Sequence, residues 1–135
     1  MSFKIHNCFL ILFALLLVLS VWHLAIALIF GGIFTEFVLH GLVAVLLSIF
    51  AIMAYGQAAL KSRVPGGLMF SCVVLSLLAF LFGVRDISIT YGIGTLESHE
   101  KLSSIVRDIV PTYFILPAAV LAYLFLLMLN KNETD

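Results

Sequence analysis

The chain alternates long apolar runs with short charged segments. Four stretches carry no formal charge and consist mostly of aliphatic and aromatic residues: residues 5–35, 37–60, 64–84 and 109–130. A bilayer core about 30 Å thick requires about 20 apolar residues at a helical rise of about 1.5 Å per residue. Each run is therefore long enough for one membrane crossing and too short for two. The pattern predicts four helices, at residues 8–32, 37–60, 66–84 and 110–130.

The apolar runs favour helices over strands. Only α-helices and closed β-barrels satisfy the backbone in lipid, and these runs lack the alternation that is typical of barrel strands. The connections at 31–36 and 61–67 contain the Gly and Pro residues that suit tight turns. We therefore predict a single all-α domain over residues 1–135. It would be an integral membrane protein with four transmembrane helices in an antiparallel bundle.

Composition supports this class of protein. Hydrophobic residues make up 64% of the chain and charged residues 10%, whereas soluble domains contain about 45–50% and about 25%. The lipid bilayer is therefore the first expected partner. Nucleic acid is not an expected partner, because the net charge is zero and phosphate binding needs a basic patch.

The number of spans predicts the orientation of the chain. An even number of crossings places both termini on one side of the membrane. Lys61 and Arg63 lie on that side in a short connection, and short basic loops favour the cytoplasm. We expect a multi-pass protein of a bacterial inner membrane with both termini in the cytoplasm.

The segment 85–108 holds half of the charged residues of the chain. Its apolar, glycine-containing part at 87–94 is too short to cross, so we expect it to lie at the membrane interface. From Thr95 onward the apolar residues recur at helical spacing, which predicts a short amphipathic interfacial helix over about 95–108 with Thr95 as its N-cap. This helix would lie on the membrane surface or cap the bundle and then turn at Pro111 into the last span.

Three histidines are expected near the same end of the bundle. His40 lies about 5 Å and His23 about 13 Å below the outer surface at the helical rise, and His99 lies on the amphipathic helix. Ionisable residues at such depth are rare and usually face the bundle interior. Each histidine has a structural interpretation, a hydrogen bond to backbone or headgroup, and a functional one, a ligand or proton-handling group. His6, at the opposite end, is interpreted as an ordinary terminal residue.

Two Arg-Asp dipeptides flank the charged segment. Arg85-Asp86 follows the third apolar run, and Arg107-Asp108 precedes the fourth. We predict ion pairs across the base of the loop, joining Arg85 to Asp108 or Asp86 to Arg107.

Sequence motifs of enzymes are absent. No P-loop, GxSxG, HExxH or dinucleotide fingerprint occurs, so an enzyme is not favoured and no catalytic residue is assigned. The charge-free runs contain no acidic residue, which argues against a pump or transporter driven by carboxylates.

Three short motifs lie where predicted helices begin or end: Leu39-His40, Phe82-Gly83 with Asp86, and His99. Together they resemble small four-helix bacterial membrane proteins suspected of binding haem, and transmembrane b-type cytochromes also hold haem between histidines on bundle helices. The resemblance spans residues 39–99 and implies haem b as a cofactor. His40 and His99 would then be its ligands. His23 and His40 differ in depth by about 8 Å at the helical rise, so those two fit poorly as a bis-axial pair.

Three functional interpretations follow. The first is a non-enzymatic accessory or assembly subunit of a larger membrane complex, or a homo-oligomer, which uses the outer end and the 85–108 loop. The second is an electron-transfer or metal-binding protein in which His40 and His99 share a haem, metal or quinone, with His23 as the next candidate. The third is a small channel or transporter whose path includes His23.

Overall fold

Four long helices dominate the structure, a computed structural model that describes residues 3–30, 35–60, 63–92 and 97–134. The helical elements are α1 (Phe3–Phe30), α2 (Thr35–Ala59), α3 (Gly66–Tyr91), α4 (Ser98–Ser104), the π-helical turns η1 (Ile105–Ile109) and η2 (Pro111–Ile115), and α5 (Leu116–Thr134). The segments long and apolar enough to cross a membrane are Lys4–Ile29, Glu36–Ala59, Gly66–Tyr91 and Pro111–Leu129. Within the described residues every regular element is helical, as predicted for an all-α fold.

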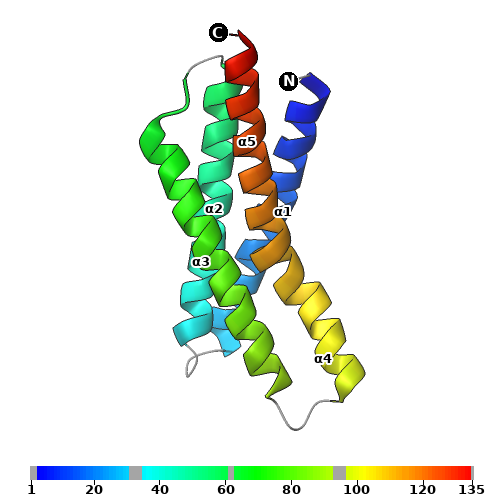
Figure 1. The fold of residues 1–135 in the computed structure, drawn as a ribbon. Helices are drawn as coiled ribbons and strands as arrows, with labels where there is room; N and C mark the ends of the chain where they lie inside the picture. Colours follow the sequence, from blue (N-terminus) through cyan, green and yellow to red (C-terminus); the bar gives the residue numbers. More distant parts are fainter. Residues whose placement is uncertain (1–2, 31–34, 61–62, 93–96, 135) are drawn as a thin grey trace.

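The two ends of the bundle carry different parts of the chain (Figure 1). Both termini lie at one end, which we call the terminal end. The loop end is the opposite one, where α1 ends, α2 begins, α3 ends and α4 begins.

The third helix is longer than predicted. It runs to Tyr91, so the predicted end of the third helix at residue 84 is wrong. Charge at Arg85-Asp86 does not end the helix, because Asp86 faces the bundle interior and only Arg85 is exposed. Gly92 then follows the helix, and its N–H bonds to the carbonyls of Ser88 and Ile89.

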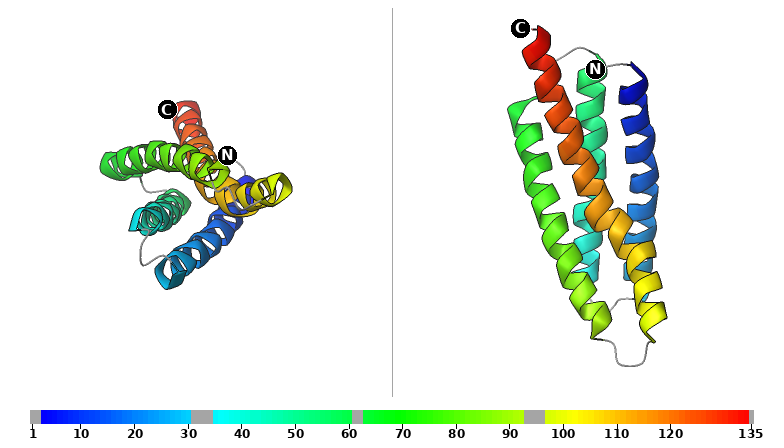
Figure 2. Two further views of the ribbon diagram at one scale, coloured as in Figure 1. Left: turned by 90° about the horizontal axis from the view of Figure 1, so that it is seen from below. Right: turned by 45° about the vertical axis from the view of Figure 1, so that its right-hand side comes forward.

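A helix occurs in the predicted amphipathic segment, but it is not separate from the last span. Its N-cap is Glu97 and not Thr95, and Thr95 itself lies outside the described residues. The backbone stays in the right-handed helical conformation at Ile105, Val110 and Leu116. The predicted turn at Pro111 is therefore wrong. Instead, the chain bends and continues as one helical rod from α4 into α5 (Figure 2).

The bend coincides with two prolines. Pro111 and Pro117 lack an N–H, so two carbonyls one turn earlier lose their α-helical partners. The neighbouring amides bond one residue further back, Val110 N–H to the Ile105 carbonyl and Leu116 N–H to the Pro111 carbonyl. Such π turns are rare and occur frequently at functional sites.

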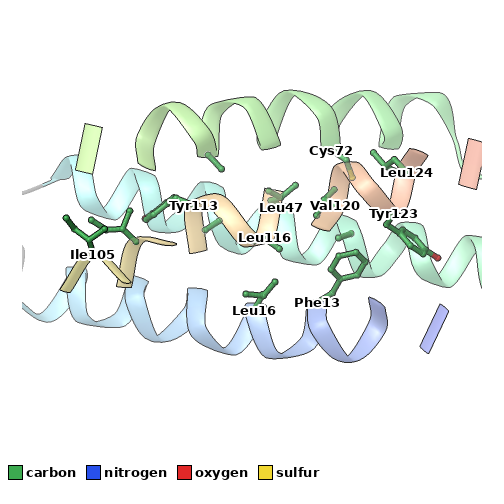
Figure 3. Packing of buried hydrophobic residues seen from close by; sticks show 14 residues of the cluster. Phe13, Leu16, Leu47, Cys72, Ile105, Tyr113, Leu116, Val120, Tyr123 and Leu124 are labelled. Atoms are coloured by element: carbon green, nitrogen blue, oxygen red, sulfur yellow. The ribbon is translucent and has the colours of Figure 1, made fainter. Parts of the chain in front are cut away.

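An apolar core fills the middle of the bundle (Figure 3). It includes Phe13, Leu16, Leu47, Leu116 and Val120. The α2 and α5 spans have 44% of their residues buried, compared with 17% for α1 and 22% for α3. The core thus lies chiefly along α2 and α5, while α1 and α3 expose broad apolar faces.

The terminal end contains a polar cluster in which the side chains bond to one another. Tyr123 Oη lies 2.8 Å from His6 Nδ1, and Tyr55 Oη donates to Asn7 Oδ1 at 3.0 Å. The ring of His6 also meets the rings of Tyr55 and Tyr123 edge-on. The interpretation of His6 as an ordinary terminal residue is therefore wrong, because it joins α1 to α5.

Candidate functional site

A buried histidine–aspartate pair lies near the loop end. His40, in the second turn of α2, places Nδ1 2.7 Å from Oδ1 of Asp86, in the last turns of α3. The two side chains are only 2% and 3% exposed. An acidic group thus lies inside the apolar bundle, contrary to the expectation drawn from the charge-free runs. The expectation failed because α3 continues past Arg85-Asp86.

The contact between His40 and Asp86 is short, but it is not aligned as a hydrogen bond. Asp86 Oδ1 lies off the direction in which a ring N–H at His40 Nδ1 points, so the contact lacks the alignment of an ordinary hydrogen bond. Neither oxygen of Asp86 has an aligned partner among the described residues. Buried polar groups without partners are uncommon and costly in a folded protein.

Aromatic rings fix the orientation of His40. Its imidazole stacks on Phe82 with centroids 4.1 Å apart and planes at 16°. Tyr113 meets His40 edge-on at 6.1 Å and His23 edge-on at 5.5 Å. Tyr113 therefore contacts both histidines, and it brings η2 into the site.

Two further buried polar atoms near this end have no hydrogen-bond partner in the part of the chain that the structure describes. They are the hydroxyl of Tyr113 and Nε2 of His23. His23 is half-buried on α1. Four elements thus contribute to one site, which comprises His23, His40, Asp86 and Tyr113.

Two close backbone approaches hold these side chains together. A Cβ added to Gly41 would lie 3.1 Å from the Cα of Leu24, so α1 and α2 nearly touch beside His23 and His40. A Cβ on Gly83 would lie 2.8 Å from Tyr113 Cβ and from the ring of Phe114. At Gly83 a side chain would force its neighbours to shift, and at Gly41 it would be tight, because both helix pairs pack closely.

An exposed ion pair covers the site at the rim. Arg85 Nε donates to Glu36 Oε1 at 2.8 Å, and the same oxygen lies 3.8 Å from His40 Nε2. Both ring nitrogens of His40 consequently face carboxylates, Nε2 toward Glu36 and Nδ1 toward Asp86. The polar atoms form a chain from the exposed rim to the buried interior.

The structure does not bring His40 and His99 together. His99 is 76% exposed on α4 and lies 3.4 Å from Glu97. The start of α2 and α4 are well separated in both views (Figures 1 and 2). Because α4 continues the axis of the last helix (Figure 2), nothing in the described residues supports a ligand shared by His40 and His99, which stays a prediction. Glu97, His99 and Glu100 form only an exposed surface group.

The predicted ion pairs across the loop base are replaced by others. Arg85 bonds to Glu36, and Arg107 bonds to its neighbour Asp108 at 3.1 Å. This hydrogen bond and the charge of Asp108 raise the pKa of Arg107 above its ordinary value. Lys101 Nζ donates to the carbonyl of Tyr91 at 3.0 Å, and this bond joins the two sides of the loop.

A sequence signal for Asp86 existed in the spacing of small residues. The buried residues of α3 are Cys72, Ser76, Ala79, Gly83 and Asp86, which recur at helical spacing. This stripe continues through the charged dipeptide and predicts that the helix does so as well. Tyr113 and Glu36 offered no comparable signal.

Comparison with protein-family models, with curated proteins and with solved structures finds no match to this chain. Function is therefore inferred from the geometry of the site.

Proposed function

We propose that this chain is an integral membrane protein that exchanges protons through the His40–Asp86 pair, as a small proton-conducting or proton-coupled transport protein. The observation that carries the proposal is the buried, incompletely bonded contact of 2.7 Å between His40 and Asp86. Ionisable residues inside membrane spans commonly mark proton relays and transport paths.

The membrane setting rests on the surface of the helices. Large apolar side chains are exposed along the spans, including Trp22, Phe70 and Leu81. The four helices would cross the bilayer in an antiparallel arrangement, with both termini in the cytoplasm of a bacterium and the loop end outside. In this setting the rim pair Arg85–Glu36 lies near the outer surface, and His40 and Asp86 lie below it.

The chemistry of the pair suits proton exchange. A neutral imidazole with a carboxylic acid has the same net charge as an imidazolium with a carboxylate, and the two forms differ by one proton moved across 2.7 Å. Adding or removing one proton changes the charge of the site by one. A pair with only a structural role gains little over apolar packing, because desolvation offsets most of the attraction between buried charges.

Proton flux in vesicles tests this proposal. The purified protein is reconstituted with an entrapped pH-sensitive dye, and flux is driven by a potassium gradient with valinomycin. We expect Asp86→Asn to reduce the flux by about 10²-fold or more, the range over which proton-transferring side chains contribute. Glu100→Gln, at an exposed carboxylate of the same end, is the matched control and should leave the flux unchanged. Wild-type flux equal to that of protein-free vesicles, or equal flux in Asp86→Asn, contradicts the proposal.

A second candidate function is favoured by the poor burial of α1. Only 17% of its span is buried, and Trp22 is 66% exposed beside His23. An accessory subunit or homo-oligomer would bury this face against another membrane protein. Purification in mild detergent followed by native mass spectrometry should then show a stoichiometric partner or a defined oligomer. A monomer carrying only lipid argues against this candidate.

A further inference from the structure

The route by which protons reach the buried pair is the next question that the geometry addresses. His40 is surrounded by titratable or charged groups from its own helix and from the elements packed against it: Glu36 of α2, Arg85 and Asp86 of α3, His23 of α1 and Tyr113 of η2. Of the two carboxylates, Glu36 is 42% exposed and Asp86 is 3% exposed. Glu36 is thus the carboxylate that both water and His40 can reach.

We infer that Glu36 is the group through which protons pass between the outer solution and the His40–Asp86 pair, and that Arg85 is a latch that controls this step. The inference rests on the proposed function. It assigns to the rim pair a role in the rate of proton exchange rather than in holding the fold together.

The transfer can be written atom by atom. Glu36 takes a proton from water at the rim and becomes a carboxylic acid, which no longer attracts the guanidinium of Arg85. The acid gives its proton to Nε2 of His40, while the proton on Nδ1 of the same ring moves to Oδ1 of Asp86. The imidazole ends neutral in its other tautomer, and Asp86 ends as the carboxylic acid. One proton enters the site, no electron moves, and the reverse order releases the proton.

The distances show why Arg85 acts as a latch. Glu36 Oε1 accepts from Arg85 Nε at 2.8 Å but lies 3.8 Å from His40 Nε2. A direct hydrogen bond requires about 2.7–3.2 Å. Glu36 must therefore leave Arg85 and approach His40, or use one bridging water. While it is bound to the guanidinium, Glu36 is a carboxylate with no proton to give.

Three variants in the same vesicle assay test the inference. Glu36→Gln keeps the shape of the side chain and removes its proton transfer, so we expect a flux about tenfold or more below wild type. Glu36→Asp should retain most of the flux, because the carboxylate is kept. Arg85→Gln removes the latch and leaves the carboxylate, and should raise the flux. Small acids such as formate, added at the outer side, should partly restore flux to Glu36→Ala.

The outcomes separate the inference from the proposed function. If Asp86→Asn abolishes flux but Glu36→Gln conducts like wild type, the route through Glu36 is wrong and the proposed function stands. If Glu36→Gln and Arg85→Gln both lower the flux equally, the rim pair is a structural clasp and the inference is overturned. If Asp86→Asn conducts like wild type, the proposed function itself fails. Formic acid crosses lipid on its own, so only restoration beyond that seen in protein-free vesicles supports the inference, even where Glu36→Gln or Glu36→Ala lowers the yield of folded protein.

Discussion

The polar side chains at the two ends of the bundle differ in their hydrogen bonding. At the terminal end, Tyr123 and His6 bond to each other at 2.8 Å, and Tyr55 bonds to Asn7 at 3.0 Å. The loop end instead holds a carboxylate without an aligned partner, together with an unpartnered phenol, that of Tyr113. The terminal end pairs each polar side chain with another, whereas the loop end contains a buried carboxylate beside a histidine without an aligned hydrogen bond between them.

This difference separates structure from function within one small protein. A polar cluster that satisfies itself stabilises the packing of helices and needs nothing else. One that leaves buried donors and acceptors unsatisfied costs stability. Such a cost is often found where a protein binds or transfers something. We therefore assign a structural role to the terminal cluster and a functional role to the loop-end site.

We expect the largest loss of stability from adding a methyl group at Gly83, where α3 packs closely against η2 beside the site. Gly83→Ala would place its Cβ 2.8 Å from Tyr113 Cβ, which forces α3 and η2 apart and should lower stability by about 1–3 kcal/mol. The matched control is Gly56→Ala near the terminal end, where a Cβ meets nothing within 4 Å. This control should stabilise its helix by up to about 1 kcal/mol. Thermal or denaturant unfolding in detergent measures both, and equal effects would contradict the close packing at Gly83.

We expect a smaller change in stability from removing one tyrosine hydroxyl at the terminal end or at the loop end. Tyr123→Phe leaves His6 without its partner and should cost about 0.5–1.5 kcal/mol. Tyr113→Phe removes a buried hydroxyl with no hydrogen-bond partner among the described residues, so stability should be unchanged or higher. Unfolding curves for the two variants compare the ends directly. A larger loss for Tyr113→Phe than for Tyr123→Phe would show that the loop-end hydroxyl is bonded after all.

The smallest effect is expected at the exposed pair outside the spans. Arg107 and Asp108 are adjacent in sequence and their side chains are 73% and 39% exposed. The raised pKa of Arg107 means that the guanidinium stays charged throughout the neutral range, yet solvent and salt screen its attraction to Asp108. The unfolding midpoint of Arg107→Ala should equal that of the wild type within experimental error. A loss as large as that of Tyr123→Phe would place this pair in a structural role.

Hydrophobic periodicity was sufficient to predict the helices but not the site. The four runs predicted α2 and the start of α3 closely, but α1 begins at Phe3, α3 continues to Tyr91, and the last helix is continuous with α4. The largest difference within a span is at the end of α3. Asp86 explains this difference, because a charged dipeptide usually marks the end of a span. Here one of its two residues turns inward to His40. That partner lies on another helix, and sequence spacing within one helix cannot reveal it.

Two of the three histidines that were expected at one end of the bundle share a neighbour there. His23 and His40 both lie near the loop end, and each contacts the ring of Tyr113. Both ring contacts depend on the position of Tyr113 in the π turn η2. This turn coincides with two prolines in a continuous helix. The pairing of His40 with His99 assumed that the amphipathic helix caps the bundle, whereas α4 continues the axis of the last helix (Figure 2).

The continuity from α4 into α5 also has a mechanical meaning. The exposed part of this rod, α4, contacts the end of α3, where Lys101 donates to the carbonyl of Tyr91. Further along, the rod packs tightly against Gly83 of α3 at Tyr113. Because helical backbone runs throughout, a rotation or pull applied to α4 is not absorbed by a flexible loop. The same continuous backbone carries Tyr113, whose ring contacts both His23 and His40, so the exposed α4 and the buried site belong to one stiff element.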